Sequence, residues 1–206
     1  MEQERSRSNL YALLSRILLQ ELDAEFLQAL RNDEVLLDFF PNLKNWDSFK
    51  TLDDATLLNE HLNVDFVNVS LLHLIPYEGF YVRDDQMIET GGANPVTDYY
   101  SAYNFVVDFE KARVVAPDHI AIELEFMHTL VEAQIKAMEA GGADVEDILS
   151  LQKEFLNKHI LQWVPMYLIS MKYESRTPLY HDAAEMAMEF LLSDNEYLSS
   201  KVKKSS

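Results

Sequence analysis

Residues 117–127 read PDHIAIELEFM and predict the start of a long amphipathic helix. Proline suits the first turn of a helix, where its missing N–H leaves no intrahelical bond unmade. We therefore expect the helix to begin at Pro117, with Ala116 as its cap and Asp118 beside the positive end of the helix dipole. His119 has no part in this pattern and is the first candidate for a functional side chain. The apolar residues that follow at helical spacing predict one buried stripe: Ile120, Leu124, Met127, Val131 and Ile135.

The rest of the chain also has helical periodicity, and no alternating run is long enough to require a strand. We predict an all-α fold, a single-domain bundle of about nine or ten helices. Asp23 and either Asp53 or Asp54 are expected to cap helices. Residues 82–97 contain two glycines and a proline and are expected to form a loop. Residues 160–171 are apolar on nearly all sides, which predicts a buried helix that Pro165 should kink or break.

Composition limits the classes of function. The chain has 206 residues, 48% of them hydrophobic, and no cysteine, so thiolate chemistry and disulfides are excluded. Its 35 acidic and 17 basic side chains give a formal charge of −18, which disfavours nucleic acid and anionic lipid and favours a basic peptide. No signal-peptide core and no apolar run of ~18 residues is present, so we expect a cytoplasmic protein with no membrane insertion. Residues 1–198 are predicted to form the domain and 199–206 a disordered basic tail.

Metal and catalytic sites are weakly indicated. Glu125 and His128 form one Glu-x-x-His pair, whereas di-iron bundles use two such pairs and two further glutamates. His119 with Glu123, and His181 with Glu185, share helix faces at i, i+4 spacing, which a surface hydrogen bond explains more simply than a metal ion. No nucleophile–base pair and no phosphate-binding loop is legible. We therefore predict no catalytic residue, no metal and no cofactor, and nucleotide binding has no support in the sequence.

Three stretches in this order resemble the TorD/DmsD/NarJ family of redox-enzyme maturation chaperones. They are residues 75–81, IPYEGFY; residues 117–127, quoted above; and residues 155–167, FLNKHILQWVPMY. The stretch from Tyr180 to Leu191 fits the last helix of that family. Gly79 is a departure, because the family usually has serine there, and Ser70 stands where a large aromatic residue is usual.

The resemblance implies a chaperone rather than an enzyme. It would bind the twin-arginine signal peptide or the apo form of a molybdenum-cofactor oxidoreductase and assist cofactor insertion before export. The alternatives are a helical-bundle metal enzyme and a general adaptor with an acidic face. The client reductase and the oligomeric state, a monomer or a helix-swapped dimer, stay open.

An apolar groove with an acidic rim at Asp65 and Glu78 is expected to hold the peptide. Asp118 and His119 could contact the peptide, contact a nucleotide or stabilise a hinge. The predicted client-binding residues are Asp65, Phe66, Pro76, Tyr77, Glu78, Tyr81, Pro117, Asp118, His119 and Glu123.

Overall fold

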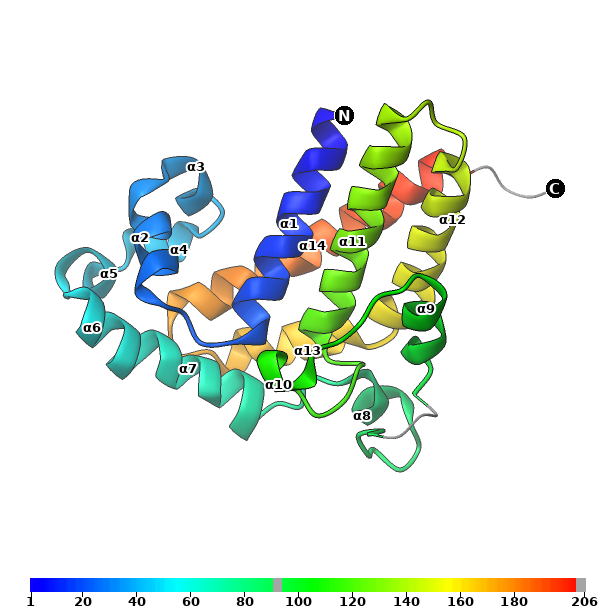
Figure 1. The fold of residues 1–206 in the computed structure, drawn as a ribbon. Helices are drawn as coiled ribbons and strands as arrows, with labels where there is room; N and C mark the ends of the chain where they lie inside the picture. The colour runs from blue at the N-terminus through cyan, green and yellow to red at the C-terminus, as the bar shows by residue number, and fades with distance from the viewer. Residues whose placement is uncertain (91–93, 203–206) are drawn as a thin grey trace. The chain divides into compact units, whose positions relative to one another are not determined.

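The computed structural model describes residues 1–90 and 94–202, and every regular element in these residues is a helix (Figure 1). The all-α prediction is confirmed. The described residues contain more helices than expected, because turns and π-helical segments divide several predicted helices into short pieces. The chain divides into two compact units. Unit 1 comprises Met1–Leu19, Tyr77–Val164 and the chain from Phe190 onward, and unit 2 comprises Gln20–Pro76 and Pro165–Glu189.

Unit 1 is built on α1 (Glu2–Leu19), which packs along α11 (Ile120–Glu139). A short turn joins α11 to α12 (Val145–Phe155), which lies beside it in Figure 1. The predicted stripe on α11 is confirmed, since all five of its residues are at most 5% exposed. Two glycines end α11 with positive φ angles, +110° at Gly141 and +86° at Gly142, which other residues rarely adopt. The remaining helices of unit 1 are α8 (Glu78–Val82), α9 (Val96–Ala102), α10 (Phe109–Ala112) and the π-helix η3 (Leu156–Ile160).

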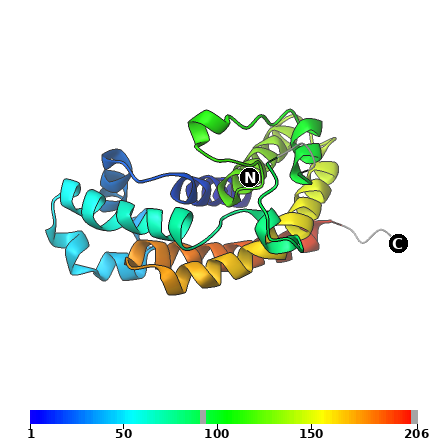
Figure 2. The same cartoon turned by 90° about the horizontal axis from the view of Figure 1, so that it is seen from below.

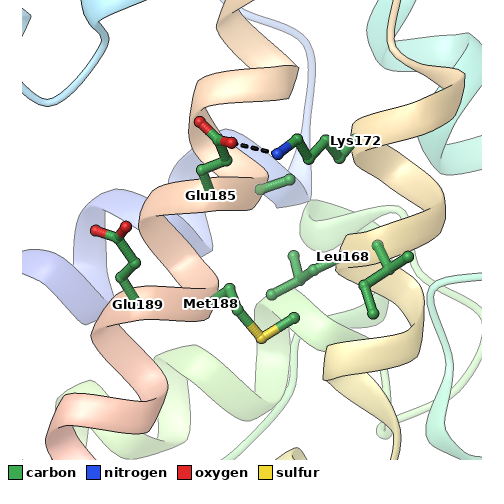
Figure 3. Close-up of a pocket in the computed structure, with 7 residues that line it drawn as sticks. Leu168, Lys172, Glu185, Met188 and Glu189 are labelled. Atoms are coloured by element: carbon green, nitrogen blue, oxygen red, sulfur yellow. Dashed lines mark hydrogen bonds and ion pairs between the residues drawn. The ribbon is translucent and has the colours of Figure 1, made fainter.

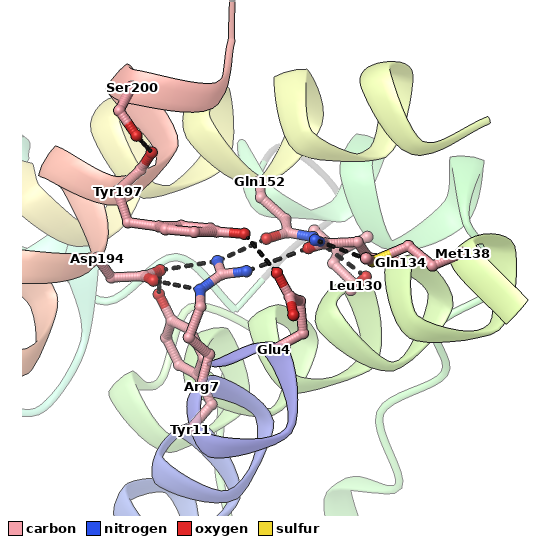
Figure 4. Close-up of polar contacts among 10 residues, drawn as sticks. All are labelled: Glu4, Arg7, Tyr11, Leu130, Gln134, Met138, Gln152, Asp194, Tyr197 and Ser200. Carbon is pink, nitrogen blue, oxygen red and sulfur yellow. Dashed lines mark hydrogen bonds and ion pairs between the residues drawn. The ribbon is translucent and has the colours of Figure 1, made fainter. Parts of the chain in front are cut away.

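A buried arginine joins four helices of unit 1 (Figure 4). Arg7 of α1 is 4% exposed and pairs with Asp194 of α14 (Pro178–Lys201). Its guanidinium also donates to Gln134 of α11 at 3.1 Å and to Gln152 of α12 at 2.7 Å. The hydroxyl of Tyr11 donates to Asp194 at 2.7 Å. Because every partner of Arg7 lies on another helix, these bonds fix how the four helices are aligned along one another.

Unit 2 begins with α2 (Ala24–Asn32), whose predicted cap is confirmed, because Asp23 accepts the N–H of Phe26 at 2.8 Å. Asp53 caps α6 in the same way, accepting from Thr56 at 3.0 Å. The other elements of unit 2 are α3 (Glu34–Leu37), α4 (Pro41–Asn45), α5 (Asp47–Thr51), α6 (Asp54–Thr56), η1 (Leu57–Leu62), α7 (Asn63–Val67) and η2 (Asn68–Leu72). The run from α6 to η2 lies along the unit 2 parts of α13 (Leu161–Glu174) and α14 (Figure 2), where Asn68 donates to the carbonyl of Glu174 at 3.0 Å.

Several local predictions are corrected. Helix α13 runs through Pro165 without a break, and the irregular turn lies before it, in η3. Met166 and Ile169 are 64% and 52% exposed, so this helix is not buried on all sides. The predicted boundary at 198 falls inside α14, and residues 203–206 of the predicted tail lie outside the described residues. The predicted loop 82–97 is observed with narrower bounds, since residues 83–95 separate α8 from α9; its residues 91–93 are not described.

Candidate functional site

Two segments of unit 1 that are far apart in sequence come together at the start of α11. Tyr77 and His119 form an isolated antiparallel bridge, and their rings lie 5.0 Å apart, edge to face. The N–H of Glu78 donates to the carbonyl of Asp118 at 3.0 Å, and the N–H of Gly79 donates to its Oδ2 at 2.7 Å. The carboxylate of Asp118 therefore holds the first turn of α8. This is the core of the candidate site.

His119, and not Ala116, caps α11. Its backbone is extended, with φ −73° and ψ 136°, and its Nδ1 accepts the N–H of Ala121 at 3.2 Å. Pro117 and Asp118 therefore precede the helix, which begins at Ile120. The expected start at Pro117 was wrong because the bridge to residues 77–79 holds this backbone extended. Burial lowers the pKa of His119 to about 3, so its ring is neutral and can accept that bond.

Three carboxyl groups are buried beside this bridge: Glu78, Asp118 and Glu123 are at most 3% exposed. Glu78 pairs with Nδ1 of His159 at 3.0 Å, and Glu123 accepts the indole N–H of Trp163 at 3.2 Å. Burial raises the pKa of Glu123, and the nearby charges of Glu78 and Asp118 raise it further.

Asp118 shares this environment. Burial raises its pKa, and the N–H of Gly79 and the side chain of Asn94 oppose that shift. Within residues 1–90 and 94–202, no hydrogen bond of ordinary geometry reaches Oδ1 of Asp118 or Oε1 of Glu123. The site therefore contains two buried carboxyl oxygens that the described residues do not satisfy with a hydrogen bond of ordinary geometry.

The predicted acidic rim is not present in the expected form. Asp65, 1% exposed, accepts the N–H of Arg176 at 2.9 Å and the N–H and hydroxyl of Thr177 at 2.7 Å, so it holds the turn before α14. Glu78 is paired internally with His159. Both carboxylates are used by the fold: Asp65 accepts backbone N–H groups at a helix start, and Glu78 bonds the side chain of His159.

The ten predicted residues divide between the units. Asp65, Phe66 and Pro76 belong to unit 2, where Phe66 is 5% exposed and lies against the ring of Tyr180, 6.2 Å away. The other seven belong to unit 1, where the structure brings them together around the bridge: Tyr77, Glu78, Tyr81, Pro117, Asp118, His119 and Glu123.

Helix α8 provides the accessible part of this region. Tyr81 is half-buried, and its ring stacks on Trp163 with centroids 5.3 Å apart. Phe80 is also half-buried and lies 5.3 Å from Tyr81, edge to face, and Val82 is 47% exposed. An apolar and aromatic surface thus lies directly beside the buried carboxyl groups.

Sequence reasoning missed three residues of this region: Tyr100, His159 and Trp163. The hydroxyl of Tyr100 donates to the carbonyl of Pro117 at 3.2 Å, which further orders the segment before α11. His159 and Trp163 stand in the 155–167 stretch and are four residues apart, which places them on one helix face. That spacing was the available signal, although their carboxyl partners could not be assigned without the fold.

The residues considered as metal ligands already bond to other residues of the protein. Nδ1 of His128 lies 2.9 Å from the hydroxyl of Ser8, while His119 and Glu123 are engaged as described above. In the described part of the chain, one group of three potential ligands, His181, Asp182 and Glu185, has its ligand atoms within 4.8 Å of one another. Asp182 accepts two backbone N–H groups at the start of α4, and Glu185 pairs with a lysine, so both already serve the fold.

The half-exposed rings on α8 are of the kind that is enriched where proteins bind other chains. Comparison with known proteins agrees. Residues 24–168 match the family model described as nitrate reductase delta subunit. No solved structure gives a significant match.

Curated relatives match almost the whole chain. The proteins named Chaperone protein TorD from Vibrio atlanticus, Aliivibrio salmonicida and Aliivibrio fischeri are 24%, 25% and 26% identical, and in each case the match covers 94% of both chains. The chain belongs to the TorD/DmsD/NarJ family of redox-enzyme maturation chaperones. Among residues 1–90 and 94–202, none of the helices has both the length and the apolar character that a membrane crossing requires.

Proposed function

We propose that this protein is a cytoplasmic chaperone that binds the twin-arginine signal peptide, or the apo form, of a molybdenum-cofactor oxidoreductase. It would retain that client until the cofactor is inserted, and then release it for export. The observation that carries the proposal is the similarity to proteins named Chaperone protein TorD over 94% of the chain. The mechanism is binding without catalysis.

Within unit 1, we assign different roles to the predicted residues. The half-exposed rings of Phe80 and Tyr81 would contact the apolar segment of the client peptide, because burying aromatic surface contributes most of the affinity in such contacts. Asp118, His119 and Glu78 would act as positioning residues, since each is at most 5% exposed and bonded to the backbone or a side chain of unit 1. The strongly negative net charge would attract the arginines of the peptide, and salt would weaken that attraction.

Isothermal titration calorimetry with N-terminal peptides of the molybdenum-cofactor oxidoreductases from the same genome tests this proposal. We expect one peptide to bind, to bind more weakly at high salt, and to lose affinity about tenfold in Tyr81→Ser, because a buried aromatic contact is removed. Tyr103→Ser is the matched control, since Tyr103 is a 48% exposed tyrosine in the same unit. Absence of binding to every such peptide would reject signal-peptide capture, and equal losses in both variants would reject the assignment to α8.

A further inference from the structure

The unit 2 part of α13 carries an exposed apolar stripe that the fold does not use. Met166, Ile169 and Tyr173 are 64%, 52% and 83% exposed. Their spacing, i, i+3 and i+7, places all three on one face of the helix. Single exposed apolar residues are ordinary on protein surfaces, but a contiguous stripe is typical of an interaction site.

An apolar groove lies between α13 and α14, entirely within unit 2, and shares Ile169 with this stripe. Its volume is about 240 Å³, enough to take a few side chains of a partner. Figure 3 shows Leu168 of α13 and Met188 of α14 at the centre of the groove, with the Lys172–Glu185 ion pair at one end. Leu168 is 1% exposed and forms the floor, whereas Ile169 continues from the groove onto the stripe.

The charges beside the groove are acidic. Glu189 lines it from α14 and is exposed, and it makes no ion pair with any described residue. Lys172, the one cation of the lining, is already neutralised by Glu185. A cation brought in by a partner would therefore meet an uncompensated carboxylate next to an apolar surface.

We propose that this groove and stripe are a docking surface for an apolar and basic amphipathic helix of a partner protein. Its large apolar side chains would fill the groove and cover Met166 and Ile169, and a lysine or arginine would reach Glu189. This is the helix-in-groove mode of recognition, in which apolar anchors supply affinity and the flanking charge supplies specificity. The surface lies in unit 2, so the inference goes beyond the unit 1 peptide site proposed above and does not depend on it.

A second copy of this chain fits the surface less well. A twofold interface would bring the same patch of each copy together, and with it the two copies of Glu185 and Glu189. Each chain also carries a formal charge of −18, so the contact would bring like charges together. A basic partner turns the same charges into attraction.

A designed peptide can serve as the probe. It would be a fluorescein-labelled helix of about 18 residues with leucine at i, i+3, i+4 and i+7 and arginine elsewhere, compared with a peptide that has glutamate in place of arginine. Fluorescence anisotropy with the full-length protein should show binding of the arginine peptide and at least about tenfold weaker binding of the glutamate peptide.

Substitutions on the stripe locate the contact. Met166→Glu and Ile169→Glu should each weaken the arginine peptide about tenfold, although the added negative charge alone would favour a cationic peptide. Val35→Glu is the matched control, because Val35 is 74% exposed in the same unit and the charge change is identical. Glu189→Lys should weaken binding about threefold or more, by removing the carboxylate that faces the partner. Far-UV circular dichroism would confirm that each variant is folded, and two independent stripe variants guard against one that is not.

Three results would overturn the proposal. The first is unchanged affinity in both stripe variants. The second is equal binding of the arginine and glutamate peptides. The third is concentration-dependent dimerisation, seen by light scattering, that Ile169→Glu abolishes, since this would make a second copy the occupant.

Discussion

The neutral state of His119 predicts a specific loss of stability in acid. In the folded protein the ring is buried and its Nδ1 accepts the N–H of Ala121, so protonation would remove the cap of α11. Burial lowers the pKa from the ordinary 6.5 to about 3. Between these two values the unfolded chain binds the proton and the folded chain does not. The free energy of unfolding therefore falls as the pH falls below 6.5.

The size of the effect follows from the shift. Each pH unit well inside this window changes the free energy of unfolding by about 1.4 kcal/mol, and because the unfolded histidine is half protonated at pH 6.5, lowering the pH from 6.5 to 4.5 should cost about 2 kcal/mol through His119 alone. His119→Asn removes the titrating group and keeps a side-chain oxygen that can cap the helix. At pH 7 we expect this variant to be less stable than the wild type by about 1–2 kcal/mol, because the ring contact with Tyr77 is lost. At pH 4.5 the difference should vanish or reverse.

Urea unfolding followed by tryptophan fluorescence measures this difference. The chain has two tryptophans, Trp46 in unit 2 and Trp163 in unit 1, so a Trp46→Phe background reports on the unit that contains His119. His119→Ala provides the comparison, and should lose about 1 kcal/mol more than His119→Asn at every pH, because it has no cap. A wild-type-minus-Asn difference that is constant from pH 7 to pH 4.5 would refute a buried neutral ring.

Three further substitutions test the same unit. Asp118→Ala should lower the free energy of unfolding by about 1–3 kcal/mol, because it leaves the buried N–H of Gly79 without its acceptor. Asp118→Asn keeps an acceptor and should lose less stability. Equal losses of the two variants in urea unfolding would contradict that hydrogen bond. Gly79→Ala should lower the free energy of unfolding by about 1–3 kcal/mol, since its Cβ would lie 3.1 Å from Oδ2 of Asp118 and 3.2 Å from a backbone carbonyl oxygen. A thermal melt indistinguishable from that of the wild type would show that the site has room for the added methyl group. Arg7→Met should cost about 3–5 kcal/mol by leaving Asp194 buried without its cation, and a much smaller cost in Arg7→Met combined with Asp194→Asn would confirm that the loss arises from the unpaired charge.

The periodicity of the chain was enough to predict the all-α fold and the buried face of α11, although not the exposed face of α13. The α11 stripe and the Asp23 cap depend only on residues within one turn or one helix of each other, so a sequence pattern records them directly. The start of α11 was predicted three residues early for a physical reason. Pro117 is compatible with a first helical turn, but the backbone of Asp118 instead bonds to Glu78, about forty residues away in the sequence. Helix propensity depends on neighbouring residues alone, so it cannot predict a competing hydrogen-bond partner that is so distant in the sequence.

The same reason explains the errors about charge. Asp65 and Glu78 are acidic residues in an acidic chain, and a solvated rim was the simplest hypothesis. Both are instead buried acceptors, one for the turn before α14 and the other for His159. The buried network of Arg7 was not predicted, because its partners come from three other helices and no spacing in the sequence relates them.

The buried carboxyl groups give the strongest physical argument for where function lies in unit 1. Asp118 and Glu123 are at most 1% exposed, and in the described part of the chain no hydrogen bond of ordinary geometry reaches one oxygen of each. Because the pKa of Glu123 is raised, the folded chain keeps a proton that the unfolded chain releases above pH 4.5, so the free energy of unfolding falls as the pH rises above that value. Glu123→Gln keeps an acceptor for Trp163 and removes this penalty, so it should be more stable than wild type at pH 7 and equal to it near pH 4. Selection for stability alone would favour glutamine at this position. Residues that lower the stability of the fold in this way concentrate at functional sites. We therefore expect Glu123→Gln to raise the midpoint of urea unfolding and to lower client maturation. A variant that gained stability and matured its client normally would show that the buried carboxyl groups have no role in the chaperone's activity.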